Sequence, residues 1–118
     1  MDAKFYVPYE TARELRLKGY PQSTDTWYVE PARGVRIFKN QTNKEFEYIA
    51  RPTYHEVLDW LEEHGWYVSV GLRLRGGVAY VSEAAKILWR PTLSCGAYRT
   101  REGALNAAIL ETLKRIYI

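Results

Sequence analysis

A chain of 118 residues with 47% hydrophobic and 26% charged residues has the composition of one globular domain, which excludes a disordered chain. Its formal net charge of +3 is too small to indicate a polyanionic partner, and its one cysteine excludes an intramolecular disulfide and a cysteine-based zinc cluster. Ten Tyr, four Trp and three Phe are an aromatic excess that suits either a thick core or a contact surface.

The charged residues are unevenly distributed. Residues 53–65 are acidic, with no Lys or Arg against Glu56, Asp59, Glu62 and Glu63. Residues 66–101 are basic, with only Glu83 against Arg73, Arg75, Lys86, Arg90, Arg99 and Arg101. Such a separation is typical of an acidic helix face beside a basic sheet, and a binding surface gives the same pattern.

The chain shows no targeting or membrane segment. Its first residues, MDAKFYVPYE, lack the apolar core and cleavage site of a signal peptide, and no apolar run approaches membrane-spanning length. We therefore expect a cytoplasmic protein with no membrane partner.

The first predicted element is a short helix over residues 8–18. Pro8 suits a first turn, Leu15 lies on an apolar face, and Gly19 is a typical stop. Residues 20–52 then alternate turn formers with short strand-like runs. These runs predict strands near residues 26–29, 35–39 and 45–49.

A second helix is predicted over residues 53–65. Thr53 and Glu56 have the spacing of a capping box, and Gly65 ends the apolar pattern. The apolar residues repeat at three- and four-residue intervals and share one face: Tyr54, Val57, Leu58 and Leu61.

Strict alternation follows in the run WYVSVGLRL, which begins at Trp66 and predicts a half-buried strand. Gly76 and Gly77 then predict a two-residue hairpin turn with positive φ. The pairs expected across this turn are Arg73 with Tyr80 and Leu72 with Val81.

Two further elements complete the chain. The run KILWR, residues 86–90, predicts a third strand that ends at Pro91. A closing helix is predicted from Thr100, as its N-cap, to residue 116. Its apolar face consists of Leu105, Ala108, Ile109, Leu113 and Ile116.

Together these elements predict an α+β fold in one domain, residues 1–118. Residues 53–118 form a helix-strand-strand-strand-helix core, with the helices packed on one face of a small antiparallel sheet. Residues 1–52 form an N-terminal helix and an irregular strand extension that extends or covers this sheet. The core predicted from this arrangement is Tyr54, Leu58, Leu61, Val68, Val70, Leu72, Val81, Leu105, Ile109 and Leu113.

The order of elements and the run ALNAAILETL resemble the double-stranded-RNA-binding domain family. The resemblance implies clustered basic residues at the start of the last helix and a loop that probes a minor groove. Here only Arg101 keeps a charge at the helix start, and Gly76-Gly77 reduces the loop to two residues. The preceding helix has an acidic exposed face that would repel phosphate, so we expect no duplex-RNA binding.

Three runs carry a second resemblance: YETARELRLKGY, PTYHEVLDWLEEHGWYVSV and YRTREGALNAAILETLKRI. They cover less than half of the chain. Together they resemble a group of small uncharacterised proteins encoded by phages, prophages and mobile elements of gut bacteria. The resemblance implies an origin and an architecture, and it carries over no functional residue.

The residues with chemical potential do not form a catalytic pattern. His55 and His64 fall on opposite sides of one helix, because nine residues turn it by about 180°, so they cannot share a metal. His55 and Asp59 form an ordinary one-turn pair or, with Glu62, a weak metal stripe. Nothing in the sequence places a base beside Cys95. We predict no catalytic residue, no metal site and no cofactor.

One surface of the predicted hairpin combines aromatic rings with guanidinium groups. Single-stranded nucleic acid or an acidic peptide binds to this chemistry, unless residues 1–52 cover the face. The candidate binding residues are Tyr67, Arg73, Arg75 and Tyr80.

Two functional classes rank above an enzyme. The first is a small non-catalytic protein-interaction module whose partner is an unidentified protein or a second copy, as a homodimer. The aromatic excess, the absence of catalytic spacing and the resemblance to mobile-element proteins favour it. The alternative is a nucleic-acid-binding protein that uses the basic and aromatic hairpin face.

Overall fold

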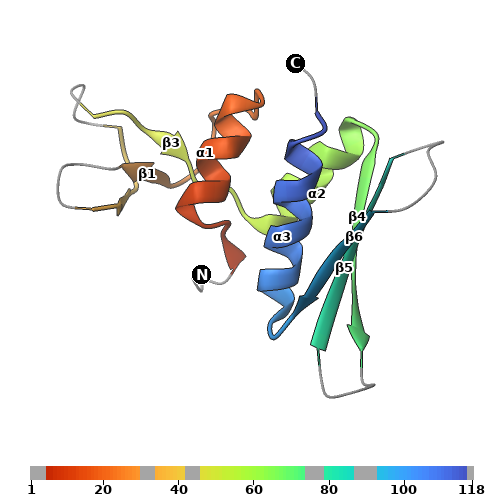
Figure 1. Cartoon of the computed structure of the whole chain (residues 1–118). Helices are drawn as coiled ribbons and strands as arrows, with labels where there is room; N and C mark the ends of the chain where they lie inside the picture. Colours follow the sequence, from red (N-terminus) through yellow and green to blue (C-terminus); the bar gives the residue numbers. More distant parts are fainter. Residues whose placement is uncertain (1–4, 30–33, 42–45, 74–78, 87–92, 117–118) are drawn as a thin grey trace.

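The computed structural model describes residues 5–29, 34–41, 46–73, 79–86 and 93–116. Figure 1 shows two antiparallel sheets on opposite sides of a helical layer. The predicted α+β class is confirmed. In chain order the elements are α1 (Tyr9–Leu17), β1 (Trp27–Val29), β2 (Arg36–Phe38), β3 (Ile49–Ala50), α2 (Tyr54–Glu63), β4 (Trp66–Arg73), β5 (Ala79–Lys86), β6 (Leu93–Tyr98) and α3 (Arg101–Leu113).

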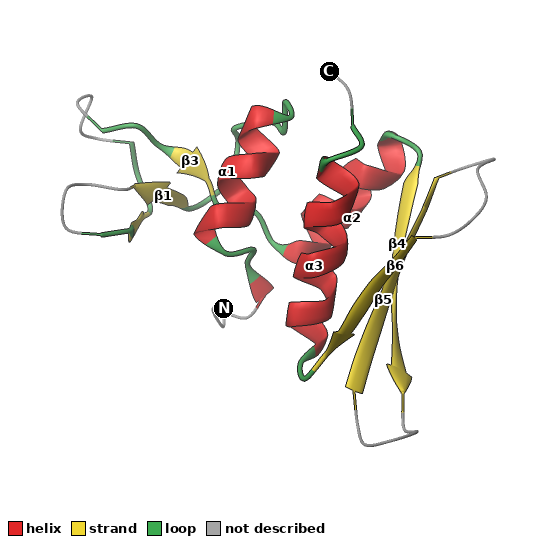
Figure 2. Cartoon of the chain, viewed as in Figure 1, coloured by secondary structure: helices red, strands yellow, loops and turns green. Residues whose placement is uncertain are grey.

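The N-terminal strands form a sheet of their own, in the order β2-β1-β3. Trp27 of β1 pairs with Phe38 on one side and with Ala50 on the other. Figure 2 shows this small sheet and α1 on the far side of α3 from strands β4–β6. The prediction that residues 1–52 extend or cover the larger sheet is therefore wrong.

Helix α2 begins where the capping box predicts. The Glu56 backbone N–H donates to Thr53 Oγ1 over 3.2 Å, and the Thr53 N–H donates to Glu56 Oε1 over 3.0 Å. Gly65, at φ 84°, supplies the left-handed residue that follows the helix. Two local signals therefore set both ends of α2.

The register between β4 and β5 differs from the predicted hairpin by one residue. Arg73 pairs with Ala79 and Leu72 pairs with Tyr80, instead of Tyr80 and Val81 respectively. The predicted Gly76-Gly77 turn falls among residues 74–78, outside the described residues. A one-residue slip moves every partner to the opposite face of the sheet.

The third strand lies later in the chain than predicted. Of the run 86–90, Lys86 ends β5 and the rest lies outside the described residues, while β6 begins after Pro91. The register shifts near Val81, so that two residues of β6 lie opposite one residue of β5, as in a β-bulge. The small residues of β6 have weak strand propensity, so the strand conformation of this segment depends on its pairing with β5.

Both helices of the C-terminal part pack on the same face of the larger sheet. Helix α3 packs across all three strands, whereas α2 packs mainly against β4. Four predicted core residues are buried, namely Tyr54, Leu61, Ile109 and Leu113. Four others are half-buried, namely Leu58, Val68, Val70 and Leu105.

Two of the residues predicted to lie in the core do not lie there. Leu72 lies near the end of β4 with 55% of its surface exposed. Val81 pairs with Gly71, on the face of the sheet away from the helices. Periodicity assigned Leu72 to the correct face, but the helices do not extend far enough to cover it.

Candidate interaction site

Of the four residues of the predicted binding surface, the two tyrosines lie on opposite faces of the sheet. Tyr67 is 46% exposed, whereas Tyr80 is half-buried on the other face, opposite Leu72. Arg73 is the last residue of β4, and the position of its side chain is not described. Arg75 lies outside the described residues. The one-residue slip in register separates Tyr80 from Tyr67.

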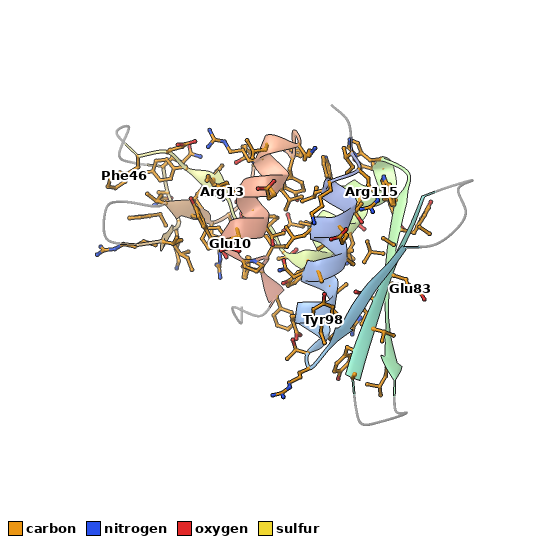
Figure 3. The ribbon with its side chains drawn as sticks, in the orientation of Figure 1. Glu10, Arg13, Phe46, Glu83, Tyr98 and Arg115 are labelled. Atoms are coloured by element: carbon orange, nitrogen blue, oxygen red, sulfur yellow. The ribbon has the colours of Figure 1, made fainter. Side chains whose placement is uncertain are left out.

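Within the described residues, the outer face of the larger sheet is largely exposed to solvent. Figure 1 shows the N-terminal part on the opposite side of the helices, and Figure 3 shows Glu83 pointing away from them. Tyr67, Ser69, Gly71 and Glu83 are all exposed on this face. None of the described residues among 1–52 therefore covers it.

One edge of the same sheet is formed by β4 and the other by β6, because the strand order is β4-β5-β6. All eight residues of β4 pair with β5 in one uninterrupted register. Native edge strands are usually protected by a charge, a proline, a bulge or short length. Residues 66–72 contain no charged residue and no proline, so this edge has none of these protections along most of its length.

Two large apolar side chains on β4 are exposed. Tyr67 lies on the outer face and Leu72 on the helix side, at opposite ends of the strand. An additional strand beside β4 would cover part of both side chains, since neighbouring strands lie about 4.8 Å apart.

Helix α2, which packs on β4, presents carboxylates to solvent. Asp59 Oδ2 lies 3.5 Å from His55 Nε2, and the Glu56 carboxylate accepts a hydrogen bond in the capping box. Glu62 and Glu63 are exposed, and their carboxylates form no ion pair or hydrogen bond within the described part of the chain. Part of this acidic face lies toward the N-terminal part, since Glu56, Asp59 and Glu63 all act on Tyr20.

Both histidines, His55 in α2 and His64 at its C-terminal end, contact residues of that helix. His64 is the C-cap residue, its Nδ1 lies 2.9 Å from the Trp60 carbonyl oxygen, and its ring lies 4.3 Å from the Trp60 ring. His64 therefore closes the C-terminal end of α2. Within the described ranges, no group of three or more His, Cys, Asp or Glu residues has the arrangement of a metal site.

Two hollows lie beside α3. One of about 750 Å³ lies between α1 and α3 and has charges of both signs at its rim, including Arg13, Glu14 and Lys114. The other, of about 550 Å³, lies between the starts of α2 and α3 and contains Tyr54 in its lining. Burial, and secondarily Glu102, raise the pKa of Tyr54 to about 12, so this phenol stays protonated to a higher pH than an exposed tyrosine.

Comparison of the chain with protein-family models, with curated proteins and with solved structures finds no match. Over the residues that the structure describes, no helix has the length and apolar character needed to cross a membrane.

Sequence reasoning missed the β4 edge as a site. The signal was visible, because WYVSVGL is a run of seven uncharged residues with high strand propensity. Its position at the edge depends on the order of strands in the sheet, which only the pairing of β5 with both neighbours establishes.

Proposed function

We propose that the chain is a small non-catalytic protein-interaction module that binds a partner polypeptide as an additional strand along β4. The observation that carries the proposal is the eight-residue, regularly paired edge strand without charge at residues 66–72. An origin in a phage or another mobile element is part of the proposal and rests on the sequence resemblance alone.

Strand addition uses groups that every edge strand presents. Half of the backbone N–H and C=O groups of an edge strand point away from the sheet and lack partners within it. An added strand gains affinity from hydrogen bonds to these groups and specificity from alternate side chains. Beside β4, the exposed Tyr67 and Leu72 offer one apolar contact on each face.

The test compares two adjacent proline substitutions, Ser69→Pro and Val70→Pro. Because N–H groups alternate in direction along a strand, one proline removes a bond to β5 and the other removes only an outward N–H. Circular dichroism and thermal unfolding identify the variant that retains the fold. We expect this variant to lose binding to extended peptides selected from a random library on the wild-type chain.

Ser69→Ala is the matched control, because it keeps the backbone N–H and should retain binding. Selected peptides that bind the folded proline variant as tightly as the wild type would contradict strand addition at β4. A library that yields no binding peptide would contradict the proposed function itself.

Nucleic-acid binding remains a second candidate, since the outer face of the larger sheet is open and Tyr67 is exposed on it. If bases stack on this ring, Tyr67→Ala should cost about 1–3 kcal/mol in binding of a single-stranded oligonucleotide. Titrations at several salt concentrations measure this. A salt-independent affinity, or an unchanged affinity in Tyr67→Ala, would remove the candidate.

A further inference from the structure

The hollow between the starts of α2 and α3 has the lining of a small-molecule site. We propose that it binds a small uncharged carboxamide whose apolar body packs against Phe5, Leu58 and Leu105 while its amide group pairs with Tyr54 and Glu102. None of the described residues of β4 lines this hollow. The site is therefore separate from the edge strand and does not depend on the proposed function.

The apolar part of the lining comes from three separate segments of the chain. Phe5 precedes α1 and is 49% exposed, whereas Leu58 of α2 and Leu105 of α3 are half-buried. The hollow of about 550 Å³ has the size of a ligand pocket, roughly 300–1,000 Å³. An aromatic or branched aliphatic body would remove the remaining surface of these three side chains from water.

Tyr54 supplies a hydrogen-bond donor that has no acceptor. This residue lines the hollow and is only 9% exposed, and its hydroxyl forms no hydrogen bond with any described residue. A buried hydroxyl without a partner is unfavourable. A ligand with a carbonyl oxygen in the hollow would provide the acceptor that the phenol lacks.

The starts of both helices add further donors. The Thr53 hydroxyl accepts from the third residue of α2, and the Thr100 hydroxyl accepts from the third residue of α3. The N–H groups of the first two residues in each helix have no acceptor inside the helix. These four residues, which all line the hollow, are Tyr54, His55, Arg101 and Glu102. The ligand therefore needs an acceptor more than it needs a donor.

Glu102 supplies one acceptor and fixes the charge of the ligand. Its carboxylate lines the hollow and forms no ion pair or hydrogen bond within the described residues. After burial it is the main group that raises the pKa of Tyr54, so the carboxylate and the hydroxyl lie near each other. Arg101 carries the opposite charge at the rim, and His55 pairs with Asp59.

Charges of both signs in one lining disfavour a charged ligand. A carboxylate would meet Glu102 and an ammonium group would meet Arg101, each at the cost of its own desolvation. An amide avoids both costs, because its carbonyl oxygen accepts from Tyr54 while its N–H donates to Glu102.

The experiment titrates the full chain with three ligands that share one aromatic body: phenylacetamide, phenylacetate and phenethylamine. Calorimetry measures each affinity. We expect phenylacetamide to bind on the order of tenfold more tightly than either charged ligand, because neither of them avoids an unpaired charge in the hollow.

Two substitutions locate the binding. Tyr54→Phe removes the unpartnered hydroxyl, keeps the ring and should weaken phenylacetamide binding about tenfold. Tyr20→Phe is the matched control, since Tyr20 is 8% exposed and does not line the hollow. Glu102→Gln keeps an acceptor oxygen without the charge, so phenylacetamide should still bind and phenylacetate should bind more tightly than to the wild type. Circular dichroism checks that each variant is folded.

Each outcome supports or overturns the site. Binding of none of the three ligands, equal affinity for all three, or tighter binding of a charged ligand would overturn it. An affinity for phenylacetamide that is unchanged in folded Tyr54→Phe would also overturn it, as would an unchanged preference in Glu102→Gln. The folded proline variant of β4 should bind phenylacetamide like the wild type, so failure of strand addition and failure of this site are distinguishable.

Discussion

The N-terminal part, up to residue 52, and the C-terminal part, from residue 53 onward, both contain helices and strands. Different interactions specify these elements in the two parts. Strands β1–β3 have two or three residues each, whereas β4 and β5 have eight. Helix α1 has no side-chain capping bond at Pro8, whereas α2 and α3 are capped by Thr53 and Thr100. Local signals therefore specify the C-terminal part, and the N-terminal part depends on packing.

Aromatic contacts supply much of that packing. On one face of the small sheet, Phe38, Phe46 and Tyr48 contact one another with ring centroids 6.0–6.4 Å apart, and Tyr48 contacts Trp27. The Arg51 guanidinium lies 3.8 Å from the centroid of the Tyr6 ring. Such contacts join residues that short strands alone would not hold together.

The two parts also share a buried cluster. Val7, Leu15 and Tyr28 from the N-terminal part pack with residues such as Leu61 and Ile109 from the C-terminal part. If the two parts fold as one unit, damage on either side should lower the stability of both.

The largest expected effect tests this shared core. Leu15→Ala and Ile109→Ala remove side chains that are at most 1% exposed and should each cost about 2–5 kcal/mol. Denaturant unfolding followed by circular dichroism and by Trp fluorescence should show one coincident transition, shifted in both variants. Leu17→Ala, at a residue that is 71% exposed, is the control. Two separate transitions would show that the parts unfold independently.

A smaller effect is expected at the polar contact between α1 and α3. The buried Thr11 hydroxyl donates a hydrogen bond to Asn106 Oδ1. Asn106→Ala leaves this hydroxyl without its partner and should cost about 1–3 kcal/mol. Adding Thr11→Val should recover part of the loss, as measured by a double-mutant cycle in urea. Strictly additive effects would mean that the contact does not couple the two parts.

The capping contrast gives the next effect. Thr53→Ala removes the hydrogen bond to the Glu56 N–H and should cost about 0.5–2 kcal/mol. Pro8→Ala, at the start of α1, removes no capping bond and should cost less. Thermal unfolding of both variants measures the difference. An equal cost would contradict the view that only the C-terminal helices depend on their caps.

The dependence of stability on alkaline pH tests one buried tyrosine in each part of the chain. Burial, then the nearby carboxylates of α2, raise the pKa of Tyr20 to about 12, and burial also raises that of Tyr54 to about 12. Above the ordinary tyrosine pKa of 10.0 the unfolded chain loses these protons while the folded chain retains them, so stability should fall between about pH 10 and 12.

Urea unfolding at several pH values checks this fall, and tyrosinate absorbance follows the titration itself. The variant Tyr20→Phe with Tyr54→Phe should lose the late-titrating absorbance and show a shallower decline. A decline as steep as that of the wild type would assign the effect to other groups.

As with the fold, some features of the candidate site were predictable from the sequence and others were not. The sequence predicted β4 through its alternation and correctly placed Tyr67 on the polar face. It placed Tyr80 on that face as well, because Gly76 and Gly77 suggested a two-residue turn. The pairing of Leu72 with Tyr80 corrects this. The acidic character of α2 was evident from the sequence, but its position on β4 was not.

The sequence by itself determined the features that depend on neighbouring residues: the three helices, the capping box at Thr53 and the alternating strand from Trp66. Each of these features depends on residues within three or four positions of one another. The same local interactions are absent from the competing conformations. Only the tertiary structure decided the strand register, the later start of β6, the separation of the N-terminal sheet and the edge position of β4. These features depend on which distant segments pair, and several pairings satisfy the same local pattern until burial of one face selects among them.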